Sequence, residues 1–273
     1  MLDINKVYCE DCHQTMDKMG ADFVDLVITS PPYFGCRQYG AETIGREEHP
    51  LDYCKGIFDV CEKVKHVLKP TGSFYLNIGD VYFGTKGFHR SKGDQSRDFH
   101  KHYKNHKIVK SDGKYLQNKQ LLLLPPRIAA MMQDSGWILR NTNIWVKSNP
   151  MPVFADDRRM PCWEYIFHFV KSDEYFFDVD QAKARDSYKD VFRTTVQPFG
   201  DHQATFPDDL IIPLIATSCP VNGLVYDPFM GSGTTAYNAI KMKRNYIGSE
   251  INPDYMKIIE RRTDDATARE DII

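Results

Sequence analysis

Short apolar runs of strand length recur along the chain, and segments of helical spacing or composition separate most of them. The apolar runs span residues 6–9, 25–29, 73–78, 138–146, 164–170, 224–229 and 246–250. Helical spacing or composition is found at residues 51–68, 126–135, 207–217 and 234–242. Such alternation is typical of a largely parallel sheet covered by helices on both faces. The pattern therefore predicts an α/β fold with seven strands.

The runs at residues 138–146 and 164–170 have no clear helix between them, which favours an antiparallel hairpin there. The length of 273 residues suits one domain with an elaboration. The longest aliphatic stretch, residues 121–124, falls far short of the ~20 apolar residues of a membrane span. The N-terminus has neither a basic start nor a long apolar stretch. We expect a single cytoplasmic domain over residues 1–273 with no membrane contact.

The cysteines do not predict a metal site or disulfides. There are seven, an odd number at irregular spacings, which favours reduced thiols. Residues 9–13 read CEDCH and match the pattern of covalent haem attachment, but no export signal or other haem signal accompanies them. A zinc site would need a second close pair of ligands, which the other cysteines do not supply. We therefore interpret these cysteines as structural and predict no metal.

Positive charge is concentrated in one segment. The whole chain has a net charge of −2, yet residues 84–119 hold ten Lys and Arg residues against three Asp residues, a local charge of +7. Glycines and few aliphatic side chains predict a long loop, which favours nucleic-acid contact over a merely solvated loop or a histidine metal site. The candidate phosphate contacts are Arg90, Lys92, Arg97, Lys101, Lys104 and Lys107, with Arg37 and Lys147 as further candidates near the motifs below.

A glycine turn follows the apolar run at residues 224–229. Residues 231–235 read GSGTT, and turns of this kind let a ligand approach the backbone at the carboxyl edge of a sheet. No lysine follows Gly233, so a phosphate-binding loop is improbable. Ala236 stands where a dinucleotide fingerprint has its third glycine, and Asp227 would repel pyrophosphate but suits the cationic end of S-adenosylmethionine. Glu250 lies 17 residues beyond Gly233, where an acid can hold ribose hydroxyls. A dinucleotide remains the alternative ligand.

A second motif, Ser30-Pro31-Pro32-Tyr33, follows the run at residues 25–29. The two prolines end the strand and make the backbone rigid. The Pro31 carbonyl and the Ser30 hydroxyl would then be held as acceptors for an exocyclic amine, and acceptors on both N–H groups favour a nitrogen whose lone pair can attack. Tyr33 could stack on a base flipped out of a duplex. A purely structural proline loop is the alternative.

With both motifs, the sequence resembles the amino-methylating DNA methyltransferases, which modify cytosine N4 or adenine N6. DPFMGSGTT at residues 227–235 is similar to their cofactor turn and TSPPY at residues 29–33 to their catalytic motif, in the order of the family's beta group. Further similar segments are NIGD at 77–80, IWVKSNPMP at 144–152, WEY at 163–165 and HQATFP at 202–207. Gln203 stands where the family usually has proline. The Pro161-Cys162 pair precedes an apolar run, so we interpret it as structural and not as the nucleophile of carbon-5 methylation.

The resemblance implies a Rossmann-like, S-adenosylmethionine-dependent methyltransferase fold, circularly permuted so that the catalytic half comes first. It places Asp11 near the cofactor adenine and Thr205-Phe206 against the methionine end. The implied cofactor residues are Asp11, Cys12, Asp227, Phe229, Gly231, Ser232, Gly233, Thr234, Thr235, Glu250, Thr205 and Phe206. The implied catalytic residues are Ser30, Pro31, Pro32 and Tyr33.

The implied activity is site-specific methylation of an exocyclic amine on a flipped base of double-stranded DNA. Ser30, where adenine enzymes more often carry Asp, favours cytosine N4; adenine N6, RNA methylation and a catalytically silent DNA-binding relative remain alternatives. Residues 178–196 form only a short segment where relatives often carry a recognition insertion. Family precedent suggests a homodimer, and a cognate restriction endonuclease is a candidate partner.

Overall fold

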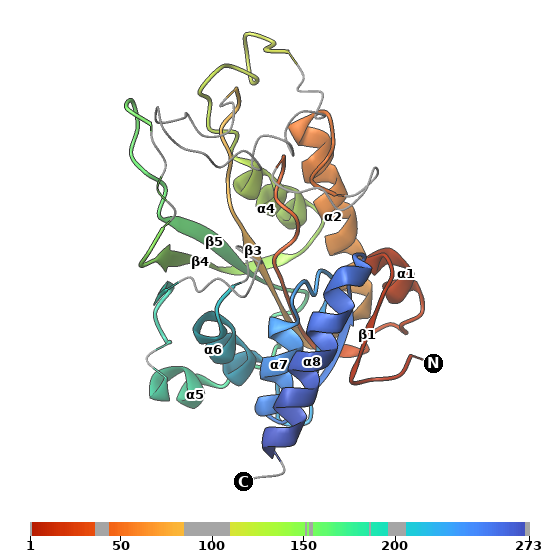
Figure 1. The fold of residues 1–273 in the computed structure, drawn as a ribbon. Helices are drawn as coiled ribbons and strands as arrows, with labels where there is room; N and C mark the ends of the chain where they lie inside the picture. The colour runs from red at the N-terminus through yellow and green to blue at the C-terminus, as the bar shows by residue number, and fades with distance from the viewer. Residues whose placement is uncertain are drawn as a thin grey trace.

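The computed structural model describes residues 2–35, 44–84, 110–150, 152, 155–185, 187–195 and 206–270. The strands are β1 (Lys6–Tyr8), β2 (Val24–Thr29), β3 (Leu68–Ile78), β4 (Ile138–Lys147), β5 (Trp163–Val170), β6 (Val191–Thr194), β7 (Leu224–Asp227) and β8 (Asn245–Ser249). The helices are α1 (Cys12–Asp17), α2 (Pro50–Val67), α4 (Leu124–Asp134), α5 (Val179–Ala184), α6 (Asp208–Ser218), α7 (Thr234–Lys241) and α8 (Pro253–Glu270). The elements form one sheet with helices around it (Figure 1).

The sheet has the strand order β1-β8-β7-β2-β3-β5-β4-β6. Its described pairings are parallel except for those of β5, which runs antiparallel to both β3 and β4. The predicted α/β fold and the predicted hairpin at β4 and β5 are thus confirmed. The carboxyl ends of the seven parallel strands and the amino end of β5 meet at the same edge.

The expected number of seven strands was wrong, because the described sheet has eight. The additional strand, β6, has four residues and pairs with β4 from Ile144↔Val191 to Lys147↔Thr194. Its pattern is too short to be recognised alone, and hydrogen bonds to β4 stabilise it. It lies with α5 in the segment 178–196. Helices α1, α5 and α8 were not predicted either. Helix α8 carries few apolar side chains, of which Ile259 and Ala266 are buried.

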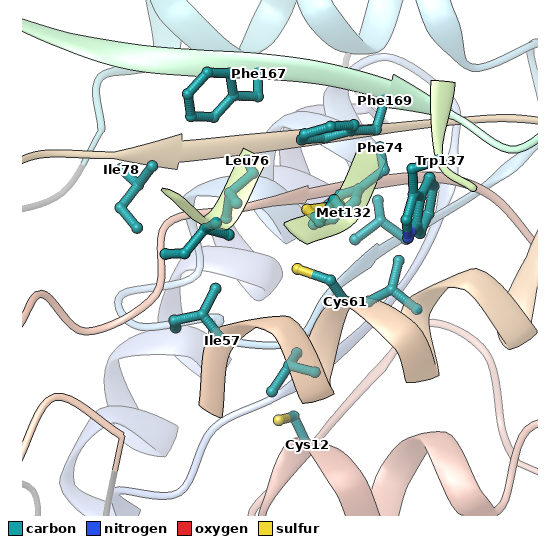
Figure 2. Close-up of a cluster of buried hydrophobic side chains, with 14 of the residues drawn as sticks. Cys12, Ile57, Cys61, Phe74, Leu76, Ile78, Met132, Trp137, Phe167 and Phe169 are labelled. Carbon is teal, nitrogen blue, oxygen red and sulfur yellow. The ribbon is translucent and has the colours of Figure 1, made fainter. Parts of the chain in front are cut away.

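Alternating side chains of the central strands divide the core into two layers. On one face, Val27, Phe74 and Leu76 pack with helices α1, α2 and α4. Figure 2 shows part of this layer, with Ile57 and Cys61 of α2 and Met132 of α4 beside aromatic side chains of β3 and β5. On the other face, Leu26 and neighbouring side chains pack against α6, α7 and α8. Burying both faces explains the nearly continuous apolar runs in these strands.

The predicted basic loop is described only in part. Its residues 85–109 lie outside the described residues, and so do the candidate phosphate contacts Arg90, Lys92, Arg97, Lys101, Lys104 and Lys107, as well as Arg37. The described residues 110–119 fold back onto the domain, where the Asp112 carboxylate accepts hydrogen bonds from two backbone amides and Leu116 is buried. Among the described residues, no helix is both long and apolar enough to cross a membrane.

Candidate active site

The two predicted motifs lie side by side although about two hundred residues separate them along the chain. Strand β2 leads into Ser30-Pro31-Pro32-Tyr33 and strand β7 ends at Asp227, and the two strands are hydrogen-bonded neighbours with Leu26↔Val225 and Val27↔Tyr226 in register. The Thr29 hydroxyl donates a 2.7 Å hydrogen bond to Asp227 Oδ1. The end of the catalytic strand is thus joined directly to the start of the glycine turn.

Asp227 lies beneath the turn and is completely buried. Besides the bond from Thr29, its carboxylate accepts hydrogen bonds from the Thr235 hydroxyl at 2.7 Å and from the Phe229 amide at 3.0 Å. Burial raises the pKa of Asp227 to about 6, although the three hydrogen bonds oppose that shift. Asp227 therefore holds the turn, helix α7 and the catalytic strand together. Its predicted contact with the cationic end of a methyl donor stays a prediction.

The glycine turn has a backbone shape that needs glycine. Gly231 has φ 57° and Gly233 has φ 84°, which are left-handed values that other residues rarely adopt. The Gly231 amide donates to Glu250 Oε2 at 2.8 Å. Gly233 also lies against helix α8, since an added Cβ would come within 3.3 Å of Ile259. The turn therefore packs tightly against α8, and of its two glycines Gly231 is partly exposed while Gly233 is buried.

The residues predicted to bind the adenosine part of the cofactor follow the next two strands of the sheet, β8 and β1. Glu250 follows β8 and its amide donates to the Tyr8 carbonyl of β1, so Glu250 and the Asp11 segment lie at neighbouring strand ends. The side chain of Glu250 accepts bonds from the amides of Gly231 and Asn252, both at 2.8 Å. Asp11 caps α1 by accepting from the His13 amide at 2.8 Å. The structure brings these predicted cofactor residues to one edge of the sheet. Of the predicted pair Thr205-Phe206, Phe206 packs against the core layer that contains α6, α7 and α8, and Thr205 lies outside the described residues.

Asp11, Cys12 and His13 also have ligand atoms within 4.8 Å of one another. Cys12 is buried, and burial raises the pKa of its thiol to about 12. Metals bind the thiolate, so this environment disfavours coordination. One oxygen of Asp11 is already used to cap α1. The cluster fits a helix start better than a metal site.

The catalytic motif leads into a polar cluster. The Tyr33 hydroxyl donates to Glu164 Oε2 at 2.7 Å, and the Ser30 hydroxyl lies 3.4 Å from the Tyr33 hydroxyl. Asn77 donates to the same Glu164 oxygen at 3.3 Å, and Lys147 forms an ion pair with Glu164 Oε1. Burial, followed by the charge of Glu164, raises the pKa of Tyr33 well above its ordinary value. Tyr33 is therefore a neutral phenol here.

Neighbouring groups fix the backbone and ring of this motif. The Tyr53 hydroxyl of α2 donates to the Pro32 carbonyl at 3.0 Å. Gly79 leaves room for the ring, because an added Cβ would lie 2.9 Å from Tyr33 Cε2. Lys147, a predicted phosphate contact, has its ammonium 4.8 Å from the centre of the Trp145 ring and paired with Glu164. Lys147 therefore belongs to the polar cluster as well as to the rim of the site.

Four further residues contact the two motifs, although no sequence pattern assigned them a role there: Thr29, Asn77, Glu164 and Arg262. Arg262 of α8 is buried and donates to the Ser232 carbonyl, the Ser232 hydroxyl and the Thr234 hydroxyl at 3.0–3.2 Å. No sequence pattern indicated it, because α8 was not predicted. Asn77 and Glu164 stand in segments that resembled the family. The antiparallel direction of β5, which places its first residues at the carboxyl edge, was the signal that could have identified Glu164.

The comparisons with known proteins agree with this geometry. The sequence profile of the family described as DNA methylase, N6_N4_Mtase, matches residues 24–261. The chain belongs to this family. It is 33% identical over 267 residues to Type II methyltransferase M.SmaI of Serratia marcescens, covering 94% of this chain and 90% of that one. It is also 33% identical over 260 residues to Type II methyltransferase M.Cfr9I of Citrobacter freundii, covering 92% and 85%.

Solved structures of other DNA methylases have the same fold. The PvuII DNA methyltransferase (cytosine-N4-specific) superimposes with a TM-score of 0.72 at 20% identity, covering 97% of this chain and 91% of that chain. The putative DNA modification methylase TTHA0409 of Thermus thermophilus, complexed with S-adenosyl-L-methionine, has a TM-score of 0.67 at 21% identity, covering 96% and 94%. This DNA methylase therefore combines the two motifs described above with the fold of the solved DNA methylases.

Proposed function

We propose that this protein is a site-specific DNA methyltransferase that transfers a methyl group from S-adenosylmethionine to the exocyclic amine of a flipped base in duplex DNA. The observation that carries the proposal is the Thr29–Asp227 hydrogen bond, which joins the catalytic motif to the glycine turn. A methyl donor on the turn and an amine beside Ser30 would face each other across two neighbouring strands. Catalysis would then rest mainly on positioning. Relative to other methyltransferases, the chain order is proposed to be circularly permuted, with the catalytic half first.

The donor side fits S-adenosylmethionine in its chemistry. Gly231 and Gly233 give a turn on which a ligand can lie against the backbone, and Glu250 brings a carboxylate beside it for ribose hydroxyls. Asp11, the N-cap of α1 shortly after strand β1, would contact the adenine. S-adenosylmethionine would supply an electrophilic methyl group on a sulfonium. Helix α7 and the hydroxyl groups of Ser232, Thr234 and Thr235 keep the turn in shape through bonds to Asp227 and Arg262.

The amine side consists of Ser30, the proline carbonyls and the Tyr33 ring. Proline geometry and the bond from Tyr53 to the Pro32 carbonyl hold this backbone rigid. Acceptors placed on both N–H groups of an amine would keep its lone pair directed at the methyl group. The aromatic ring of Tyr33 would contact the face of the flipped base.

The target base is proposed to be cytosine, modified at N4. Serine at the first position of the catalytic motif supports this choice, and so does the structural similarity to the PvuII enzyme, which is described as cytosine-N4-specific. Adenine N6 is the second candidate, because both bases present an exocyclic amine to the same acceptors. Glu164 and Asn77 beside Tyr33 offer further polar contacts to either base.

The proposed substrate is double-stranded DNA, contacted through the phosphates by the basic segment 84–119, by Arg37 and by Lys147. The relatives named above are Type II methyltransferases, which supports a restriction-modification system with a cognate endonuclease. A homodimer is the proposed assembly. The proposed location is the cytoplasm, where a DNA substrate would be reached.

The test uses labelled S-adenosylmethionine with mixed-sequence duplex DNA, matched RNA as the control, and nucleoside digestion with mass spectrometry. N4-methylcytosine in the DNA is the expected product. N6-methyladenine would keep the mechanism and overturn the choice of base. Methylated RNA alone, or donor binding without any product, would overturn the proposed function.

A further inference from the structure

The transfer of a methyl group to an amine produces a proton that the catalytic motif itself cannot take. As the nitrogen forms its new bond to carbon, the donor's carbon–sulfur bond breaks and leaves its electron pair on sulfur, so the nitrogen becomes a cation that must lose a proton. Ser30, Pro31 and Pro32 have no basic side chain. Burial and a neighbouring carboxylate raise the pKa of Tyr33, so no phenolate is available. The proton needs an acceptor elsewhere.

Glu164 is positioned to receive that proton. It is the first carboxylate reached from Ser30 along the hydrogen bonds of the described residues: the Ser30 hydroxyl lies 3.4 Å from the Tyr33 hydroxyl, which donates to Glu164 Oε2 at 2.7 Å. The other Glu164 oxygen is paired with Lys147. The Glu164 side chain is 11% exposed and that of Lys147 25%, so the far end of this chain of groups reaches solvent.

We propose that Glu164 accepts the proton released by the methylated amine, which reaches it through the hydroxyls of Ser30 and Tyr33. These two hydroxyls and Glu164 form a proton relay, and Glu164 sets the direction of its hydrogen bonds. With the Tyr33 proton donated to Glu164 and the Ser30 proton donated to Tyr33, Ser30 Oγ is left as an acceptor toward the amine. During transfer, the amine proton passes to Ser30 Oγ, the Ser30 proton to the Tyr33 oxygen and the Tyr33 proton to Glu164. Glu164 becomes neutral, the product amine becomes neutral, and solvent later removes the proton.

This inference rests on the proposed function, and Glu164 acts through other groups, so it is a positioning residue. Among the described residues, the charged or titratable groups in contact with Glu164 are Lys147 from β4 and Tyr33 from the loop after β2. Asp80, beyond β3, is turned toward helix α4, where it accepts a 3.1 Å bond from the Leu124 amide. Asn77 and Gly79 of the adjoining segment are neutral. Glu164 is therefore the one carboxylate among these contacting groups, and the proposed proton transfer ends on it.

The experiment compares single-turnover methyl transfer by the wild type and Glu164→Gln, with donor and DNA saturating, over a range of pH. General-base assistance is worth about 10²-fold or more, so the ratio of the two rates should reach about 10² near neutral pH and should change with pH, because only the wild type has a carboxylate that can accept the proton. Titration of Asp227 affects both proteins and cancels in this ratio. Glu164→Asp should recover part of the rate, and Asp59→Asn, which breaks an exposed ion pair with Lys55, should match the wild type.

A ratio that is independent of pH would indicate a structural role only and would overturn the inference. Tyr33→Phe keeps the ring and leaves no charge unpaired, so it tests the relay even if Glu164→Gln folds poorly; combining both changes should cost no more than either alone. A readout without turnover is the NMR titration of ¹³C-labelled tyrosine, in which Glu164→Gln should lower the pKa of Tyr33. Absence of methyl transfer by the wild type would instead defeat the proposed function.

Discussion

The hydroxyl of Thr29, at the end of β2, donates a 2.7 Å hydrogen bond to the buried carboxylate of Asp227, at the end of β7. Thr29 is the first residue of the TSPPY motif, and Asp227 lies four residues before Gly231, the first glycine of the turn. Since Asp227 also binds Thr235 and the Phe229 amide, a movement of one motif is transmitted to the other. The two motifs are therefore linked to each other inside the protein core.

Replacing Thr29 by Val should destabilise the protein and weaken catalysis. Val has nearly the same shape but removes the hydroxyl, which leaves part of the buried Asp227 carboxylate unsatisfied at a cost of about 1–3 kcal/mol. Urea denaturation measures the loss, and single-turnover kinetics measures the transfer rate. Thr29→Ser keeps the hydroxyl and is the control. Equal stability of all three proteins would show that the hydrogen bond is unimportant.

Asp227 should make stability depend on pH. Its folded pKa of about 6 lies above the ordinary value of 3.8, so between these values the folded state binds more protons than the unfolded state. Stability from this group is therefore greatest below pH 3.8 and is lost as the pH rises through about 6, by roughly 3 kcal/mol. The difference in unfolding free energy between the wild type and Asp227→Asn, followed across this window, isolates the effect. A difference that does not change with pH would contradict it.

Gly79→Ala should reduce turnover without weakening donor binding. The added Cβ would lie 2.9 Å from Tyr33 Cε2 and 3.3 Å from Glu164 Oε1, so the ring must move. Misplacement of about 1 Å in a positioned site can cost ~10²-fold in rate. Gly20→Ala is the matched control, since nothing lies within 4 Å of its added Cβ. The measurements are the single-turnover rate and the dissociation constant of the donor; a normal rate would show that the ring position is not critical.

Arg262→Ala should weaken donor binding although Arg262 lies behind the turn. Its Nη1 donates to the Ser232 carbonyl and to the Ser232 and Thr234 hydroxyls, and its Nη2 lies 3.6 Å from Asp208 Oδ1. Losing hydrogen bonds from a charged group costs about 1.5–3 kcal/mol, part of which should appear as a loosened turn. Isothermal titration with S-adenosylmethionine gives the affinity. Lys257→Ala on the same helix is the control, and equal affinity of the two variants would contradict the role.

Neutralising Lys101, Lys104 and Lys107 together should flatten the salt dependence of DNA binding. Each phosphate contact contributes about 0.9 to the slope of log K against log salt for duplex DNA. Fluorescence anisotropy with a labelled duplex at several salt concentrations measures the slope, and the sequence preference should change little. An unchanged slope would exclude the basic segment 84–119 as the phosphate-binding element.

The sequence by itself determined the α/β class, the positions of most strands and the two motifs that belong to the DNA methylase family. This was possible because strands buried on both faces give long apolar runs, and because the left-handed backbone at Gly231 and Gly233 favours glycine. Local patterns of this kind do not depend on the rest of the chain.

The tertiary structure alone decided which distant residues meet at the site. The pairing of β2 with β7 joins Thr29 to Asp227, and the reversed direction of β5 brings Glu164 to Tyr33. It also placed Asp227 beneath the turn, inside the protein, where its carboxylate accepts hydrogen bonds from Thr29, Thr235 and the Phe229 amide. Strand order, short edge strands such as β6 and the packing of Arg262 arise from long-range contacts, which leave no periodic signal in the sequence.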